Sequence, residues 1–331
     1  MSQLAHVAIH PSQFPEKVRK DLIESLRTRR INHKFHYDSI KQTQQWLALH
    51  QAFSPSRTDA DCAATYDRSF KAAAAHGTSQ HVHVIGLGCG GGQKDTRLLR
   101  LLRKSGREAT YTPSDVSTAM VLVARQVALT VIPNERCFPL VCDLASANDL
   151  SAVFGRTREI LPKADRLVTF FGMIPNFEPQ LILPRLSDLL RRGDRLLFSA
   201  NLAPGPDYLA GVRKILPLYD NALTRDWLMT FLLDVGVKDS DGKLRFVIEE
   251  DPDGNDLLRI AAYFQFSRAR KISVDNHIFD FANRERIRLF FSYRHTPDLI
   301  RTMLAQHRLE VLNEWITESE EEGVFLCSKR R

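Results

Sequence analysis

Short apolar segments alternate with leucine-rich amphipathic segments between residues 81 and 200. The apolar segments, each expected to form a strand, are HVHVIGL from His81, then 109–113, 137–142, 166–171 and 195–200. The amphipathic segments, each expected to form a helix, are 94–104, 116–129 and 181–192. Strands and helices that alternate with short connections predict parallel βαβ units, so we expect a doubly wound α/β sheet.

This alternation stops between residues 204 and 281. Two helices are expected there, followed by three antiparallel strands, at 209–216, 226–235, 246–250, 257–266 and 271–279. We therefore expect two domains. The first contains the sheet and consists of residues 57–203 and 294–331. The second is an α+β substrate-binding cap made of residues 1–56 and 204–293. Thr58 is expected to cap the helix that follows it.

The composition, 44% hydrophobic and 26% charged over 331 residues, is that of an ordinary globular protein. It excludes disordered and collagen-like chains. No uncharged apolar stretch reaches the roughly eighteen residues of a membrane helix, and the first thirty residues lack a signal-peptide pattern. We expect a cytoplasmic protein without membrane segments, either a monomer or a weak homo-oligomer.

A formal net charge of +7 raises the question of nucleic-acid binding. The largest basic cluster follows helical spacing, opposite a row of leucines, and consists of Arg97, Arg100, Arg103, Lys104 and Arg107. This is the pattern of the solvated face of an amphipathic helix. Aromatic residues that could stack on bases do not interleave with it. We expect a small-molecule substrate and no nucleic-acid partner.

Five scattered cysteines without a C-x-x-C pair predict free thiols rather than disulfides or a structural zinc site. His81 and His83 share one face of an expected strand, but no third ligand stands at a useful spacing. We expect no metal.

The clearest chemical signal is a glycine cluster between the strand at His81 and the next helix. Glycines at 86, 88 and 90–92 allow the backbone to approach a ligand, and the helix start offers free N–H donors. Gly86, Gly88 and Gly91 satisfy the G-x-G-x-x-G frame of NAD-binding proteins. The glycines alone therefore leave the nucleotide open.

Asp115 and Asp143 are expected at the ends of the next two strands, where open parallel sheets bind ligands. The first carboxylate can accept the two hydroxyls of a ribose. The second can accept an adenine amino group, with Leu144 packed on the ring. A dinucleotide needs only the first. The second carboxylate and the polar helix start at 93–95 therefore favour S-adenosylmethionine over NAD.

Several motifs resemble the histidine Nα-methyltransferases of ergothioneine biosynthesis and a fungal relative that N-methylates dimethylallyltryptophan. They are FHYD at 35–38, FSPSRTD at 53–59, GCGGGQK at 88–94, PSDVS at 113–117, FGMIPNF at 171–177, GD at 193–194 and LYD at 218–220. The resemblance implies a Rossmann-like methyltransferase core, and a second domain built from an N-terminal segment and a late insertion.

The resemblance also implies roles for individual residues. S-adenosylmethionine would be held by Phe53, Gly88, Gly90, Lys94, Asp115, Asp143 and Leu144. The carboxylate of an amino-acid substrate would be held by Asn176 and Tyr219, with Gly172 alongside. Tyr37 would act at the amine that receives the methyl group.

The chain departs from the family at three positions. Phe53 replaces a tyrosine, Pro175 stands where the family has glycine, and Phe290 with Ser292 replaces a glutamate–serine pair that binds the imidazole of histidine. Phe290 can neither accept a proton from an imidazole nor balance its charge. We therefore expect a less polar side chain on the substrate.

These observations predict an S-adenosylmethionine-dependent methyltransferase of specialised, natural-product metabolism. We expect it to N-methylate an amino acid or similar metabolite other than histidine. One alternative keeps the donor and moves the methyl group to oxygen or carbon. Another is a basic protein of the same fold that binds a partner without catalysis. A dehydrogenase is the most distant possibility.

Overall fold

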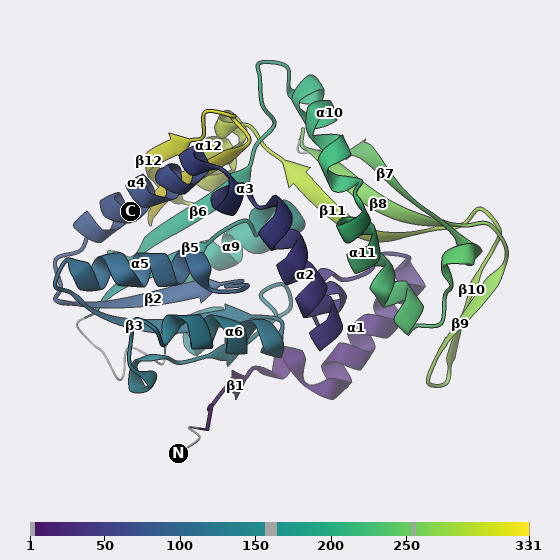
Figure 1. Ribbon diagram of the computed structural model, residues 1–331, viewed down its shortest axis with the longest axis horizontal. Coiled ribbons are helices and arrows are strands. Elements are labelled where there is room, and N and C mark those ends of the chain that lie inside the picture. Colours follow the sequence, from purple (N-terminus) through teal and green to yellow (C-terminus); the bar gives the residue numbers. More distant parts are fainter. Residues whose placement is uncertain (1–3, 156–163, 253, 255, 331) are drawn as a thin grey trace. The chain divides into compact units, whose positions relative to one another are not determined.

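The computed structural model of the chain describes residues 4–155, 164–252, 254 and 256–330 (Figure 1). Its contacts divide the chain into two compact units. The core unit comprises the described parts of Met1–Gln13, Pro55–Leu202 and Thr296–Arg331. The insert unit comprises the described parts of Phe14–Ser54 and Ala203–His295.

The core unit is built on a mixed sheet with the strand order β1-β4-β3-β2-β5-β6-β13-β12. The strands are β1 (Ala8–Ile9), β2 (His81–Leu87), β3 (Glu108–Asp115), β4 (Leu140–Val141), β5 (Asp165–Phe170), β6 (Arg195–Asn201), β12 (Leu309–Ile316) and β13 (Glu322–Lys329). Strands β1 to β6 pair in parallel, and β13 is antiparallel to both β6 and β12. The strand order reverses beside β2, where an open parallel sheet binds its ligand.

Helices cover both faces of this sheet. On one face α5 packs against α4 and α6, and on the other α9 packs against α7 and α12. Their bounds are α3 (Pro55–Thr58), α4 (Ala60–Ala75), α5 (Gln93–Lys104), α6 (Thr118–Ala128), α7 (Leu150–Val153), α9 (Pro179–Leu189) and α12 (Pro297–Gln306), with short 3-10 turns at Pro11–Gln13, Asn134–Arg136 and Ile174–Asn176. This arrangement confirms the predicted doubly wound, Rossmann-like core.

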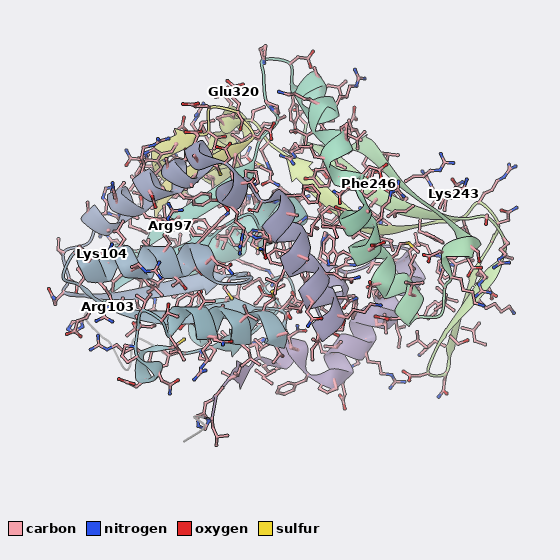
Figure 2. All side chains as sticks on the ribbon, in the orientation of Figure 1. Arg97, Arg103, Lys104, Lys243, Phe246 and Glu320 are labelled. Atoms are coloured by element: carbon pink, nitrogen blue, oxygen red, sulfur yellow. The ribbon has the colours of Figure 1, made fainter. Side chains whose placement is uncertain are left out.

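Local sequence explains these elements. Val84 and Ile85 of β2 are fully buried, as β-branched residues in a central parallel strand should be. In α5 Leu98, Leu99 and Leu102 are fully buried. Its cationic side chains, Arg97, Arg103 and Lys104 among them, project away from the sheet (Figure 2).

Two features of the core unit differ from the sequence analysis. The described residues up to Gln13 lie with the core unit rather than with the cap, because Ala8 and Ile9 pair with Leu140 and Val141. A pairing of only two residues leaves no hydrophobic pattern in the sequence. Thr58 is not the helix cap: Asp59 is, since its carboxylate accepts the N–H groups of residues 61 and 62.

The insert unit contains an antiparallel sheet of order β11-β8-β7 and a separate β9-β10 hairpin. The strands are β7 (Gly242–Glu250), β8 (Leu258–Phe266), β9 (Arg270–Val274), β10 (His277–Phe281) and β11 (Arg286–Arg294). The single strand expected at 271–279 was wrong. Asp275, with φ at 50°, reverses the chain there and makes a hairpin.

Four helices of the described insert unit carry its aromatic core. They are α1 (Pro15–Thr28), α2 (Ile40–Phe53), α10 (Tyr208–Tyr219) and α11 (Ala222–Asp234), with 3-10 turns at His33–His36 and Asp239–Asp241. Helix α10 packs on β7 and β8, and α11 packs on α2. Trp227, Phe231 and Phe264 are among the buried side chains that join these layers.

Within the described residues, no helix is long and apolar enough to cross a membrane.

We expect His83→Gln to flatten the pH dependence of stability. Burial, assisted by the charge of Arg166, lowers the pKa of His83 from its ordinary 6.5 to about 3. Because the pKa in the folded state is lower than that in the unfolded chain, this stabilisation is complete above pH 6.5 and is lost as the pH falls toward 3. One such histidine costs about 2 kcal/mol at pH 5.

Urea unfolding midpoints between pH 7.5 and 5 measure this effect. His81→Gln, at an exposed position of the same strand, is the matched control. If His83→Gln loses stability with falling pH as steeply as the wild type, the burial argument is wrong.

Candidate functional site

The loop after β2 takes a conformation that favours glycine. Gly88, Gly90 and Gly92 have φ values of 63°, 49° and 73°, in the left-handed region. A Cβ at Gly92 would lie 2.7 Å from the Cα of Ala124, and one at Gly88 would displace the side chain of Met173. Packing and backbone conformation both require glycine here, and the loop presents its backbone at the carboxyl end of the central strand.

Asp115, the last residue of β3, holds this loop. Its Oδ2 accepts the N–H of Gly90 at 3.0 Å, and its Oδ1 accepts the N–H of Ser117 at 3.0 Å. Burial raises the pKa of Asp115, while these backbone hydrogen bonds oppose the rise. Each carboxylate oxygen has a further lone pair, so Asp115 can also accept ligand hydroxyls.

Asp143 and Leu144 lie just beyond β4, after Cys142. The Oδ1 of Asp143 accepts the N–H of Ala145 at 2.9 Å, and its backbone N–H donates to the Oγ of Ser12 at 3.0 Å. Leu144 is 4% exposed. The strand order therefore brings the two acidic residues found from sequence to neighbouring strand ends, and the N-terminal segment contributes a support that the sequence did not indicate.

Lys94, in the first turn of α5, belongs to a buried polar cluster. Its Nζ donates to the hydroxyl of Tyr66 at 2.6 Å and lies 3.6 Å from the Oε1 of Glu322. The same hydroxyl bonds to Glu322 and lies 2.9 Å from the Oγ of Ser199. Burial, followed by the charge of Glu322, raises the pKa of Tyr66, so the phenol stays protonated.

Sequence reasoning missed Tyr66 and Glu322 in this cluster. They come from α4 and β13, 256 residues apart in the chain. No local pattern marks them.

Gly172 and Asn176 follow the carboxyl end of β5. Gly172 has φ at 66° and donates its N–H to the Oγ of Ser199 at 2.8 Å. Asn176 ends the 3-10 turn Ile174–Asn176, and its backbone N–H donates to the carbonyl of Met173. Both residues belong to the core unit, and Gly172 is joined through Ser199 to the cluster that holds Lys94.

The other predicted residues belong to the insert unit, where several of them lie in a row of aromatic rings. The ring of Tyr37 lies 6.0 Å from that of Trp46 and 5.5 Å from that of Trp227. Phe290 lies 5.6 Å from Trp227 and 6.3 Å from Tyr219. Tyr37 and Phe290 thus both contact Trp227.

Tyr219 and Ser292 are in direct contact. Their hydroxyl oxygens are 2.8 Å apart. Phe290 and Ser292 are two residues apart on β11, beyond a bulge at residues 288–290, so they share one face of the strand. Phe53 is placed differently from these residues, because it ends α2 with 52% of its surface exposed.

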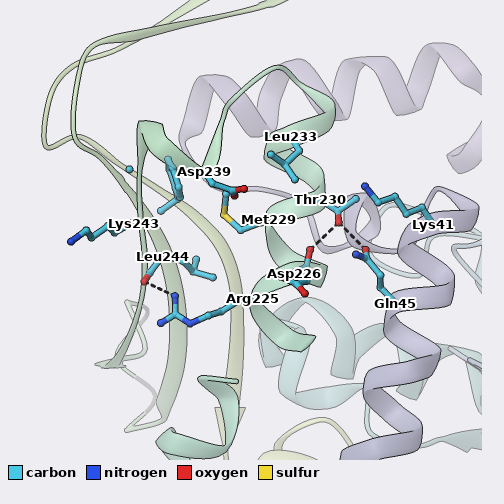
Figure 3. Close-up of a pocket in the computed structure, with 12 residues that line it drawn as sticks. Lys41, Gln45, Arg225, Asp226, Met229, Thr230, Leu233, Asp239, Lys243 and Leu244 are labelled. Carbon is cyan, nitrogen blue, oxygen red and sulfur yellow. Dashed lines mark hydrogen bonds between the residues drawn. The ribbon is translucent and has the colours of Figure 1, made fainter. Parts of the chain in front are cut away.

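A pocket of about 590 Å³ in the insert unit contains none of the residues predicted from sequence. It lies between α2, α11 and β7 (Figure 3). Thr230 on its wall donates to Gln45, and Arg225 donates to the carbonyl of Leu244 at 3.2 Å. These side chains bond to the protein itself, and the pocket gives no indication of chemistry.

The polar groups at this edge of the core unit suit a ligand that consists of an adenosine with a methionine tail. It combines carboxylates after two neighbouring strands, an ammonium at a helix start and a glycine loop. Among the described residues, no group of three or more His, Cys, Asp or Glu side chains is arranged to hold a metal ion.

The family model described as "Histidine-specific methyltransferase, SAM-dependent" matches residues 18–213 and 254–329. No curated protein matches the chain significantly.

Solved structures similar to the chain include two methyltransferases. Magnesium protoporphyrin IX methyltransferase from Synechocystis is 15% identical, with 88% of this chain and 95% of that chain covered and a TM-score of 0.46. The 1,6-didemethyltoxoflavin-N1-methyltransferase from Burkholderia thailandensis is 12% identical, with 100% and 93% covered and a TM-score of 0.42. Such low similarity carries no argument about substrate.

We expect Asp115→Asn to weaken binding of S-adenosylhomocysteine by about 10- to 100-fold, the effect of losing one hydrogen bond to a charged group. The amide would also place an N–H₂ group against the N–H of Gly90 or of Ser117. Calorimetric titration measures the Kd. Asp67→Asn, at a half-exposed carboxylate that pairs with Arg97, is the control. An unchanged Kd in Asp115→Asn would remove this residue from the site.

Proposed function

The chain belongs to the family of histidine-specific, S-adenosylmethionine-dependent methyltransferases, and we propose that it methylates the amino nitrogen of an amino acid, or a close analogue, other than histidine. The family establishes a methyltransferase with S-adenosylmethionine as its donor. The acceptor is the part that we propose.

Residues of the core unit would hold the donor. Asp115 would accept the ribose hydroxyls, and Asp143 would accept the adenine amino group, with the apolar Leu144 against the ring. The glycine loop, with Gly88 and Gly90, would offer its backbone to the methionine tail, and Lys94 would neutralise the tail carboxylate. Support comes from Asp115 and Asp143 following neighbouring strands, and from Lys94 being fixed by Tyr66. The family resemblance adds Phe53 as an aromatic contact to the donor.

Side chains that can donate hydrogen bonds would hold the acceptor. An Asn amide and a Tyr hydroxyl can both donate to a carboxylate, which suits Asn176 and Tyr219, with Gly172 beside Asn176. Tyr37 would orient the amine through its hydroxyl.

Phe290 is the observation that supports an acceptor other than histidine. It is 7% exposed and packs on Trp227, Tyr219 and His33. The family resemblance gives this position to a glutamate that binds an imidazole. An apolar ring there would leave the polar atoms of an imidazole without a partner, which costs about 1–3 kcal/mol for each buried group. Apolar and aromatic substrate side chains pay no such penalty.

The bound donor supplies a sulfonium methyl group: the amine lone pair forms the N–C bond while the S–C bond breaks and its electron pair remains on sulfur. The protein has to place the amine about 3–3.5 Å from the methyl carbon and in line with the bond that breaks. One proton must leave the nitrogen for each methyl group added. Water or Asp38 can take it, since partial desolvation raises the pKa of Asp38, against the opposing charge of Lys34.

O- or C-methylation of a small natural product remains the second candidate. The residues proposed to hold S-adenosylmethionine would serve a nitrogen, oxygen or carbon acceptor equally. We also propose that the reaction belongs to specialised metabolism in the cytoplasm. The ordinary globular composition and the free cysteines support that location.

We expect the wild type to prefer an apolar or aromatic amino acid over histidine by at least about tenfold in kcat/KM. Phe290→Glu should reverse this preference toward histidine, because it restores an acceptor for the imidazole. Phe290→Leu keeps the position apolar and should keep the preference. Release of S-adenosylhomocysteine from a panel of free amino acids measures all three. Strong activity of the wild type on histidine would overturn the proposed acceptor.

Tyr37→Phe should lower kcat by about 10- to 100-fold and leave the Kd of S-adenosylhomocysteine unchanged, since the proposed role of the hydroxyl is to orient the amine. The aromatic contacts to Trp46 and Trp227 remain in this variant. Tyr263→Phe removes a phenol of the same unit that bonds to Glu249, and it should keep full activity. Unchanged turnover in Tyr37→Phe would exclude the proposed role.

A further inference from the structure

Arg294 is the next residue on the face of β11 that carries Phe290 and Ser292. Alternate residues of a strand point to the same side, so positions 290, 292 and 294 form one row. Arg294 is 8% exposed, although arginine is rarely buried without a specific contact. Its burial beside this row calls for a reason.

Its guanidinium contacts Tyr219. The Nη2 of Arg294 donates to the hydroxyl of Tyr219 at 2.9 Å, and the guanidinium carbon lies 5.4 Å from the centroid of the same ring. The Oγ of Ser292 also contacts that hydroxyl, at 2.8 Å. The phenol oxygen therefore contacts both a cation and a second hydroxyl.

The direction of these hydrogen bonds follows from chemistry. A guanidinium only donates, so the oxygen of Tyr219 must accept from Arg294. The phenol proton is then directed to Ser292 or to a bound acceptor. A hydroxyl that accepts from a cation also becomes a stronger donor. Together these groups present O–H donors and a nearby positive charge, which suits a carboxylate.

Another buried arginine of the insert unit has a different environment. Arg259 is 3% exposed, and its guanidinium bonds to the carboxylate of Glu249 at 2.8 and 2.7 Å. Arg259 therefore bonds to an anion. The hydrogen bond of Arg294 to Tyr219 goes to a neutral hydroxyl at a predicted substrate residue.

We propose that Arg294 is a positioning residue that sets the specificity of the enzyme for acceptors bearing a carboxylate. It acts through Tyr219, by fixing and polarising its hydroxyl. The inference rests on the proposed function and adds a determinant that selects the anionic end of the acceptor, whereas Phe290 selects its side chain.

The test compares the best amino-acid substrate of the wild type with its carboxamide, which has nearly the same shape and no charge. The wild type should prefer the acid by about 100-fold in kcat/KM, and Arg294→Gln should lose about 10- to 100-fold of that preference, the value of one hydrogen bond to a charged group. The loss should fall on the KM of the acid and on its Kd with the S-adenosylhomocysteine complex, with little change in kcat.

A double-mutant cycle tests whether the effect passes through Tyr219. Adding Arg294→Gln to Tyr219→Phe should change the preference by less than about twofold, because the hydroxyl is already gone. Arg294→Lys should keep part of the preference, because it retains the charge without the planar fork. Arg286→Gln, an exposed position of the same strand, is the matched control and should behave as the wild type.

Several outcomes overturn the inference. The first is an unchanged preference for the acid over the carboxamide in Arg294→Gln. The second is a double variant in which the two single losses of preference multiply. The third is an Arg294→Gln variant that loses kcat/KM equally for acid and carboxamide and also binds S-adenosylhomocysteine more weakly to the same degree. If Arg294→Gln does not fold, the variant Arg294→Lys replaces it. A folded Arg294→Lys that prefers the acid over the carboxamide as strongly as the wild type overturns the inference. A wild type that binds S-adenosylhomocysteine but methylates no amino acid instead overturns the proposed function, and this inference with it.

Discussion

The proposed binding site for S-adenosylmethionine depends on the hydrogen bonds of Asp115. One carboxylate, at the end of β3, accepts from Gly90 in the loop after β2 and from Ser117 before α6. It therefore joins the neighbouring strand end to the start of the next helix and holds a left-handed loop in place. The parallel sheet makes this possible, because it brings the carboxyl ends of β2, β3 and β4 to one edge.

A single strand face accounts for the proposed acceptor specificity. On β11, Phe290 supplies an apolar surface, while Ser292 and Arg294 supply polar groups around the hydroxyl of Tyr219. The buried polar atoms are arranged around one oxygen, and the apolar ring lies at the other end of the row. An amino acid has the same division, with a charged end and a side chain of variable polarity. Membership of the family establishes methyl transfer from S-adenosylmethionine, and we propose that these positions select the acceptor.

The sequence predicted the features that depend on local order. Asp115 and Asp143 follow apolar segments, so their place at strand ends could be inferred without a structure. Tyr66, Glu322 and the pairing of Ala8 with Leu140 could not, because each depends on a contact between distant segments. The β9-β10 hairpin was missed because Asp275 interrupts a continuous β-branched pattern without a glycine or proline. Arg294 could have been found by continuing the alternation from Phe290 and Ser292.

The most direct measurement of the central claim is the identity of the methylated atom. Incubation with S-adenosylmethionine carrying a carbon-13 methyl group and an equimolar mixture of free amino acids, followed by NMR and mass spectrometry, identifies both acceptor and atom. The account predicts label on the α-nitrogen of an apolar or aromatic amino acid. Label on histidine would contradict the role of Phe290, and label on oxygen or carbon would contradict N-methylation.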